Sequence, residues 1–273
     1  MNRIDLHIHS SASDGRLSPA ALVDAAIVGG LDVIALTDHD TAAGVAEAVH
    51  AAAGRPLHII PGIEISARHG AAEVHLLGYF IDPAADSILA HQRESVGRRE
   101  DRMRRMVGRM RELGVAVEYA DVLRAAGPET RSIGRPHLAR ALLAAGHVRS
   151  FPEAFDRYLA DGAAAHVETD FPSVATAIDT IRRAGGVAVW AHPEISLFER
   201  EIRAFAALGM AGVECFRPNT LPIDSLLLET TARSLGLFRT GGSDWHGPHR
   251  TLLGDFHLRF DEIRDFLEAR FAP

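Results

Sequence analysis

The sequence predicts an α/β fold in which a parallel β-sheet is covered by helices, either as a barrel or as a doubly wound sheet. Short apolar segments alternate with longer segments of helical periodicity along most of the chain, and repeated strand–helix units of this kind form parallel sheets. The length of 273 residues is enough to bury a large core. We therefore expect one large α/β domain, or one such domain with an inserted piece.

The predicted elements follow in order from the N-terminus. Residues 4–10 alternate between apolar and polar side chains, as a half-buried strand does. Ser18 and Pro19 mark the start of a helix that ends near Gly29 and Gly30. A nearly continuous apolar run at 32–38 is typical of a strand buried on both faces, and Thr41 is expected to cap the next helix. The remaining strands are expected at 57–65, 73–81, 186–193, 210–216 and 236–244, and the remaining helices at 174–184, 199–208 and 224–235.

The middle of the chain differs from the rest because residues 97–165 contain no convincing strand. Residues 97–114 have the pattern of a charged amphipathic helix, and shorter helical segments follow. Such a helix commonly serves only as a solvated face. We expect residues 1–96 and 166–273 to form the sheet domain, and 97–165 to form a helical insertion that acts as a cap over the substrate.

Composition excludes several classes of function. No run of about 18 apolar residues could span a membrane, the N-terminus lacks the apolar core of a signal peptide, and the single cysteine excludes an internal disulfide. These features fit a cytoplasmic location. The net charge of −7 argues against non-specific binding to duplex DNA. All 29 basic residues are arginine, which excludes a Schiff-base lysine, a P-loop lysine and a carboxylated lysine between two metal ions.

Polar residues cluster at the carboxyl ends of the predicted strands. In parallel α/β folds the active site lies outside these strand ends, so side chains that are far apart in the sequence should meet at one mouth. The residues in question are His7, His9, Asp38, His39, Asp40, Glu64, His75, His192, Asp244 and His246.

The spacing of these residues indicates metal ions. His7 and His9 are two positions apart, as are Asp244 and His246, so each pair projects from one side of an extended strand. Neutral imidazole suits Zn, Fe and Mn, whereas carboxylates favour harder ions and can bridge two of them. About six histidines and three carboxylates exceed the needs of one tetrahedral ion, so two or three ions are expected.

Other conspicuous residues have structural interpretations. Asp5 and Asp38 are expected to orient the ligands from a second layer rather than to bind metal. Cys215 lies in an apolar run and is expected to be buried, not nucleophilic. The isolated histidines are expected at the surface or as hydrogen-bonded core residues: His50, His58, His91, His147, His249 and His257.

Taken together, the motifs resemble those of the PHP family, which is named for polymerase and histidinol phosphatase. The matching segments are, in chain order, DLHIHSSASDG, ALTDHD, PGIEIS, EVHLLGYF, WAHP and GGSDWHG. The resemblance covers essentially the whole chain and implies a distorted seven-stranded (β/α) barrel with a helical insertion and a trinuclear metal centre.

The resemblance also implies a ligand set and a metal. The three implied groups are His7, His9, Glu64 and Asp244; Glu64, His75 and His192, with Glu64 as the bridge; and Asp14, His39 and His246. Mn²⁺ is the expected ion, with Zn²⁺ and Fe²⁺ as alternatives, because mixed nitrogen and oxygen ligands suit all three.

Within the insertion, the segment IGRPHLARAL resembles that of the small stand-alone PHP phosphoesterases. This branch includes enzymes that remove the 3′-phosphate from nucleoside 3′,5′-bisphosphates, and relatives that trim short RNA from its 5′ end. The resemblance implies a phosphomonoesterase in which an activated water attacks phosphorus without a phosphoenzyme.

Several residues outside the ligand set are candidates for substrate contacts. Arg135 would grip phosphate, and His137 would contact phosphate or donate a proton to the leaving alkoxide; the alternatives are a salt bridge at a helix start for Arg135 and a capping or packing role for His137. Arg217 would be a phosphate contact or a surface arginine. Phe216 or Trp245 would stack on a base.

The sequence leaves other functions open. Within enzymes, the alternatives are a 5′-3′ exoribonuclease, a histidinol-phosphate-type phosphatase, and an amidohydrolase-type deaminase or lactonase, many of which need a carboxylated lysine that this chain cannot provide. A non-catalytic binding module stabilised by metal is the alternative from another class. The expected partners are a nucleotide or short RNA, with no duplex DNA and no membrane, and the oligomeric state stays open.

Overall fold

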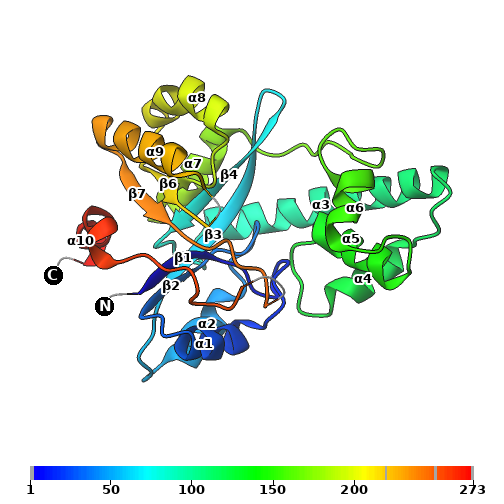
Figure 1. Ribbon diagram of the computed structural model, residues 1–273, viewed down its shortest axis with the longest axis horizontal. Coiled ribbons are helices and arrows are strands. Elements are labelled where there is room, and N and C mark those ends of the chain that lie inside the picture. Colours follow the sequence, from blue (N-terminus) through cyan, green and yellow to red (C-terminus); the bar gives the residue numbers. More distant parts are fainter. Residues whose placement is uncertain (1–2, 219, 249–250, 272–273) are drawn as a thin grey trace.

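The computed structural model describes residues 3–218, 220–248 and 251–271, so His249 lies outside the described residues. Its centre is a seven-stranded sheet whose strands follow one another in chain order (Figure 1). The strands are β1 (Ile4–Ile8), β2 (Val33–Leu36), β3 (His58–His69), β4 (Ala72–Tyr79), β5 (Val187–Trp190), β6 (Gly212–Phe216) and β7 (Phe238–Gly241). The sheet curls so that its first and last strands approach each other. The backbone N–H of His9, just after β1, donates to the carbonyl of Trp245, just after β7, at 3.0 Å. The predicted α/β class and distorted barrel are confirmed.

The strand β4 departs from the parallel sheet that the strand–helix pattern predicts. It pairs antiparallel with both β3 and β5, whereas the other neighbours pair parallel. Only residues 70 and 71 separate β3 from β4, and Gly70 has a φ of 60°. A connection this short permits only antiparallel pairing, since parallel strands need a long crossover. The resulting hairpin carries Glu64 and His75.

Helices cover the outer face of the sheet (Figure 1). Leu22, Ile178 and Phe198 are among the apolar side chains that these helices bury against it. The covering helices are α1 (Pro19–Val28), α2 (Val45–Ala52), α7 (Val174–Arg183), α8 (Ile195–Ala207) and α9 (Pro222–Ser234). The other face is buried against the C-terminal segment, which contains the short 3-10 helix η2 (Phe260–Glu262) and α10 (Arg264–Phe271). Burial on both faces accounts for the continuous apolar runs of the parallel strands.

The two predicted helix starts have different outcomes. Ser18 does cap α1, because its hydroxyl accepts a hydrogen bond from the N–H of Ala21 at 3.2 Å and Pro19 follows it. The prediction for Thr41 is wrong, since α2 begins at Val45. The Thr41 hydroxyl instead accepts from the N–H of Ala43, two residues on, which forms a local turn.

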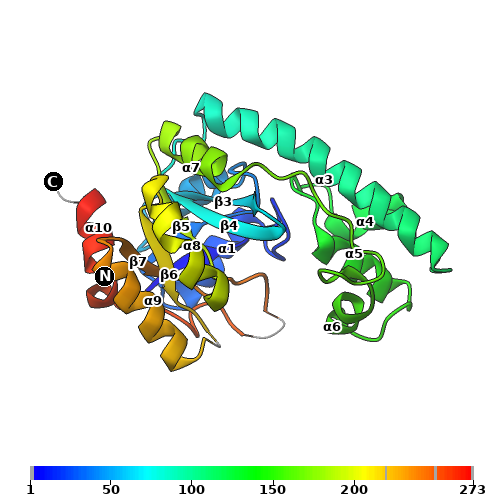
Figure 2. The same cartoon turned by 90° about the horizontal axis from the view of Figure 1, so that it is seen from above.

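A separate group of helices follows β4. It consists of α3 (Asp86–Glu112), α4 (Tyr119–Ala126), α5 (Arg135–Ala144), α6 (Phe151–Ala154) and the short π-helix η1 (Phe155–Leu159). This segment has an apolar core of its own, which includes Met106, Val122 and Leu142. Figure 2 shows that α3 begins beside α7 and extends beyond the sheet to the shorter helices. The domain boundary at residue 97 stays a prediction, because α3 crosses it.

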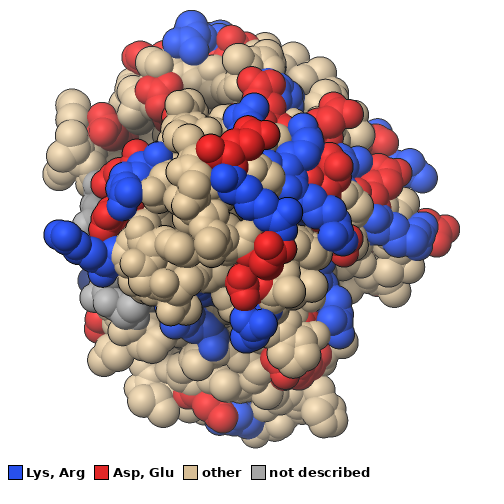
Figure 3. Space-filling view, turned by 90° about the vertical axis from the view of Figure 1, so that its right-hand side faces the viewer, with Lys and Arg blue, Asp and Glu red and all other residues tan. Residues whose placement is uncertain are grey.

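Part of the charge on α3 is paired within the helix, and part with residues outside it, as in the ion pair of Arg99 with Asp40. Ion pairs between residues four apart join Arg98 to Glu94 and Arg105 to Asp101. Figure 3 accordingly shows acidic and basic side chains interspersed on the side of the molecule where the helical segment lies. None of the helices in the described ranges is long and apolar enough to cross a membrane.

Candidate metal centre

The structure brings the histidines and carboxylates at the strand ends together around one residue, Glu64 of β3. Its side chain is fully buried. The Oε1 atom lies 2.9 Å from Nδ1 of His75 and 2.9 Å from Nε2 of His192. Five histidine rings lie against the two carboxylate oxygens, namely His7, His9, His39, His75 and His192. A carboxylate in this position can bridge two cations.

The two histidines of the first strand converge on the other Glu64 oxygen, as their spacing predicts. Oε2 lies 3.4 Å from Nε2 of His7 and 3.3 Å from Nε2 of His9. Asp244 approaches the same two nitrogens, with Oδ1 at 3.4 Å and 3.2 Å, respectively. Its side chain is 42% exposed, whereas the two imidazoles are inaccessible. The cluster therefore opens to solvent beside Asp244.

A further carboxylate, Asp14, lies on the far side of His9. Its Oδ1 is 3.2 Å from Nε2 of His246, and its Oδ2 is 3.9 Å from Nε2 of His39. The His246 ring stacks on the His9 ring, with 4.0 Å between centroids. These side chains extend the cluster beyond the shared carboxylate Glu64.

The residues fit divalent metal ions. Buried polar atoms of a folded protein are normally hydrogen-bonded, yet five buried atoms of this cluster have no hydrogen-bond partner: Nε2 of His7, both ring nitrogens of His9, Nδ1 of His39 and Oε2 of Glu64. Three groups hold ligand atoms within 4.8 Å of one another, namely His9 with Asp14, His39 and His246; His7 with His9 and Glu64; and His39 with Glu64 and His75. His9, His39 and Glu64 each belong to two of these groups.

The charges of the cluster favour a cation. Burial lowers the pKa of His75, but nearby carboxylates, chiefly Glu64, outweigh burial and raise the pKa to about 10. The pKa of His246 also reaches about 10, because the charge of Asp14 outweighs the effect of burial. Burial and the neighbouring His246 lower the pKa of His9 to about 3. Divalent ions would replace the protons that otherwise neutralise the carboxylates, so metal binding should release protons.

Two residues of the cluster have strained backbones. The φ angle is 29° at His192 and 53° at Asp244. Positive φ is uncommon for residues other than glycine and costs about 1–3 kcal/mol. Asp244 follows β7 and His192 follows β5, so in both cases the chain turns sharply where the strand ends.

The two predicted second-layer aspartates contact backbone N–H groups and serine hydroxyls rather than imidazole. Asp5 Oδ1 accepts from the N–H of His7 at 3.3 Å and from that of Ser243 at 2.8 Å, which links the first and last strands. Asp38 accepts from the hydroxyls of Ser10 and Ser13, both at 2.6 Å. It therefore fixes the loop between His9 and Asp14.

Two carboxylates that sequence reasoning missed contact the histidines directly. Glu214 of β6 lies 2.9 Å from Nδ1 of His7 and accepts from the N–H of His192 at 2.7 Å. Glu73 of β4 lies 3.1 Å from Nε2 of His75. Carboxylates in such positions fix the tautomer and orientation of a metal-binding imidazole. Two sequence signals could have identified them: Glu214 is a charged residue inside an apolar run, and Glu73 lies two positions before His75 on the same strand.

Arg135 and His137, both at the start of α5, point in different directions. Arg135 lines a cavity of about 180 Å³ together with His75 and His192, so it stays a candidate for phosphate binding. His137 is fully buried. Its Nδ1 accepts from the N–H of Gly134 at 2.9 Å, and its Nε2 contacts the carbonyl of Ser13 at 3.1 Å. Both nitrogens contact backbone groups, which favours the capping and packing alternative, and a substrate contact for His137 stays a prediction.

The other proposed contacts differ in accessibility. Arg217 lies 3.9 Å from Glu214, is partly exposed and has a buried Nε without a hydrogen-bond partner, so its role stays a prediction. Trp245 is buried and its indole N–H donates to the carbonyl of Thr251 at 3.0 Å, and its stacking on a base stays a prediction. Cys215 is fully buried, and burial raises the pKa of its thiol.

Comparisons with known proteins agree with this geometry. A family model described as PHP domain matches residues 5–121. A 3′,5′-nucleoside bisphosphate phosphatase of Chromobacterium violaceum is 36% identical over 254 residues, which cover 91% of this chain and 88% of that protein. A 5′-3′ exoribonuclease of Haemophilus influenzae is 34% identical over 90% of each chain.

Solved structures show the same architecture. A predicted metal-dependent phosphoesterase of Bifidobacterium adolescentis superposes with a TM-score of 0.89 at 34% identity and covers 97% of this chain and 95% of its own. A protein of Chromobacterium violaceum described as an amidohydrolase, crystallised with sulfate and no metal, superposes with a TM-score of 0.85 at 35% identity and covers 91% of this chain and 89% of its own.

Proposed function

The chain belongs to the PHP domain family of metal-dependent phosphoesterases, and we propose that it hydrolyses the 3′-phosphate of nucleoside 3′,5′-bisphosphates. The observation that carries the proposal is the buried carboxylate of Glu64, with histidines on both oxygens and ligand atoms that lack hydrogen-bond partners. The substrate is suggested by the similarity to the bisphosphate phosphatase along nine-tenths of the chain.

The distances around Glu64 and Asp14 support the ligand set that the sequence motifs imply. We propose that the ions are held by His7, His9, Asp14, His39, Glu64, His75, His192, Asp244 and His246. Mn²⁺ is the proposed ion, because mixed imidazole and carboxylate ligands suit it, as they do Zn²⁺ and Fe²⁺. A centre of three ions would use all nine side chains.

The chain's own residues would position the substrate. Bound ions would supply water activation and neutralisation of the phosphate oxygens. Asp244, His192 and His246 are the most exposed members of the cluster, so the ester would enter on their side. Arg135 lines the cavity beside His192 and His75 and would bind an anionic group of the substrate there. With Cys215 buried, no phosphoenzyme on that thiol is proposed.

A 5′-3′ exoribonuclease is the second candidate, because the relative from Haemophilus influenzae is nearly as similar. Both kinds of substrate carry a phosphate ester on a nucleoside 3′-oxygen, so one metal centre could act on either. The difference would lie in whether the protein accepts a chain beyond that phosphate. The helical segment is proposed as the cap that decides this.

The first experiment is phosphate release from adenosine 3′,5′-bisphosphate in the presence of Mn²⁺. Adenosine 5′-monophosphate (AMP), histidinol phosphate and a 5′-phosphorylated RNA oligomer serve as parallel substrates, and a Glu64→Gln variant controls for contaminating phosphatase. We expect rapid conversion of the bisphosphate to AMP with little release from AMP itself. Turnover of only the RNA would favour the exoribonuclease, and turnover of only histidinol phosphate would refute nucleotide specificity.

A further inference from the structure

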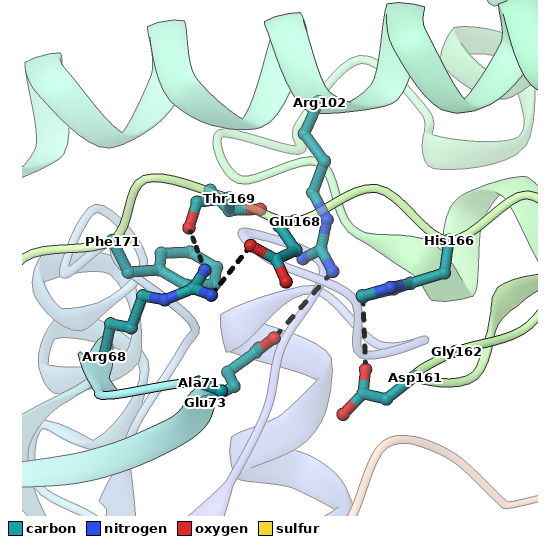
Figure 4. A pocket seen from close by; sticks show the side chains of 10 residues that line it. All are labelled: Arg68, Ala71, Glu73, Arg102, Asp161, Gly162, His166, Glu168, Thr169 and Phe171. Carbon is teal, nitrogen blue, oxygen red and sulfur yellow. Dashed lines mark hydrogen bonds and ion pairs between the residues drawn. The ribbon is translucent and has the colours of Figure 1, made fainter.

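A second cavity, of about 250 Å³, is lined by Glu73, which contacts His75 of the metal centre; Figure 4 shows the side chains that line this cavity. It lies between the β3–β4 hairpin, α3 and the segment that links η1 to α7. Its charged lining residues are Arg68, Glu73, Arg102, Asp161, His166 and Glu168. Ligand pockets for drug-sized molecules measure about 300–1,000 Å³, so this cavity suits a single substituent such as a phosphate group better than a whole nucleoside.

Glu73 connects this cavity to the metal centre. His75 presents Nδ1 to Glu64 at 2.9 Å and Nε2 to Glu73 at 3.1 Å, on opposite sides of its ring. The second oxygen of Glu73 lies 3.8 Å from Arg102 and 3.7 Å from Arg135. The two guanidinium groups are therefore on the side of His75 that faces away from the cluster. A phosphate bound to them would be separate from a phosphate at the metal ions.

These arginines share one buried carboxylate, although Nε of Arg102 also donates to the carbonyl of Val167 at 2.8 Å. Glu73 is shared by His75, Arg102 and Arg135, so one buried carboxylate faces three basic side chains. The side chains of Arg102 and Arg135 are only 7% and 20% exposed. Burial lowers the pKa of Arg102 to about 10, and the nearby Arg135 adds to this effect although Glu73 opposes it. A further anion at this place would be electrostatically favourable.

Asp161 supplies an anion at this place. Its Oδ1 lies 2.6 Å from Nη1 of Arg135 and 3.4 Å from Nε2 of His166; Figure 4 shows the contact with His166. The side chain is 69% exposed and belongs to a segment without helix or strand. An ion pair this exposed contributes little stability, so another anion can displace it.

We propose that Asp161 is an internal competitor for the substrate: its carboxylate occupies Arg135 and His166 until the phosphate group that is not hydrolysed displaces it. The inference rests on the proposed function, since it assigns the 5′-phosphate of the nucleotide to the place where this cavity meets the one that Arg135 lines; Glu73 and Asp161 line both. Asp161 thereby weakens the binding of every 5′-phosphorylated nucleotide, including the product AMP, and helps product release.

The test is the affinity of the Mn²⁺-loaded protein for AMP, measured by isothermal titration with wild type, Asp161→Asn and Asp161→Ala. Asp170→Asn is the matched control, because Asp170 is exposed on the same segment and makes no ion pair or hydrogen bond with the described residues. Adenosine, which lacks a phosphate, is the control ligand. Thermal unfolding of each variant verifies that the fold is intact.

We expect AMP to bind about two- to fivefold more tightly to both Asp161 variants, which corresponds to the loss of one exposed ion pair. The difference should shrink at high salt because salt screens the pair. Adenosine affinity and the Asp170→Asn variant should not change. Equal or weaker AMP binding by the Asp161 variants, or no AMP binding to any of the proteins, would overturn the inference. The proposed function fails separately, if the wild type releases no phosphate from the bisphosphate.

Discussion

Replacing His137 by glutamine tests whether this residue supports the fold or takes part in the chemistry. The ring joins two parts of the chain, since its Nδ1 accepts from Gly134 at the start of α5 and its Nε2 contacts the carbonyl of Ser13. The first contact requires an unprotonated Nδ1. A neutral imidazole with its proton on Nε2 satisfies both contacts, whereas the imidazolium ion satisfies only one.

The pH dependence of stability follows from this geometry. Burial lowers the pKa of His137 from 6.5 to about 4, although the charge of Asp14 opposes the shift. Between these values the unfolded chain binds the proton and the folded protein does not, so stability rises with pH. The stabilisation is complete above about pH 6.5 and is lost as the pH falls to about 4. At about 1.4 kcal/mol per pKa unit, it amounts to about 3 kcal/mol.

The measurement is urea denaturation of wild type and His137→Gln at intervals between pH 7 and pH 4. Acidification weakens metal binding and carboxylate interactions equally in both proteins. The difference between their free energies of unfolding therefore isolates the contribution of His137. We expect wild type to be more stable at pH 7 and this advantage to fall by about 3 kcal/mol by pH 4. An advantage that does not change with pH would refute the buried neutral ring. A loss of kcat by about 10²–10⁴-fold at intact stability would indicate a general acid instead.

Two other substitutions test the centre and its support. Glu64→Gln removes the shared carboxylate, so bound metal measured by mass spectrometry should fall at least about tenfold, and undiminished metal content would contradict the bridging role. Asp40→Asn or Arg99→Met breaks a buried ion pair in which Nε of Arg99 lies 2.8 Å from Oδ2 of Asp40. Each variant should lower the free energy of unfolding, measured in urea, by about 3–5 kcal/mol. The double variant should lower it by less than the sum of the two single effects, and simple additivity would show that the two charges do not depend on each other.

Much of the site can be predicted from strand periodicity alone. His7 and His9 share a face because they are two apart on a strand, and both do approach Oε2 of Glu64. The convergence of strand ends needs only the α/β pattern, because parallel strands end at one edge of the sheet. Even the antiparallel β4 delivers His75 to this edge, since the hairpin places Ser66 of β3 opposite it, two positions from Glu64.

The supporting carboxylates are harder to predict. Glu214 contacts His7 across 207 positions of sequence, so the pairing depends on the register and curvature of the whole sheet rather than on local spacing. The sequence does contain one signal, because burying an ionised carboxylate in an apolar strand costs free energy unless the carboxylate has a partner. Glu214 in β6 therefore indicates an unidentified basic partner without naming it.

The same two-residue spacing has opposite meanings in the strand and in the helix. Side chains at positions i and i+2 of a strand point to the same side, whereas in a helix they are about 200° apart around the axis and do not face each other. Arg135 and His137 open α5, and accordingly Arg135 lines the cavity next to His192 while His137 turns into the core. The letters of the motif suggest that both residues are substrate contacts, whereas its place at the start of a helix predicts that the two side chains point to different sides.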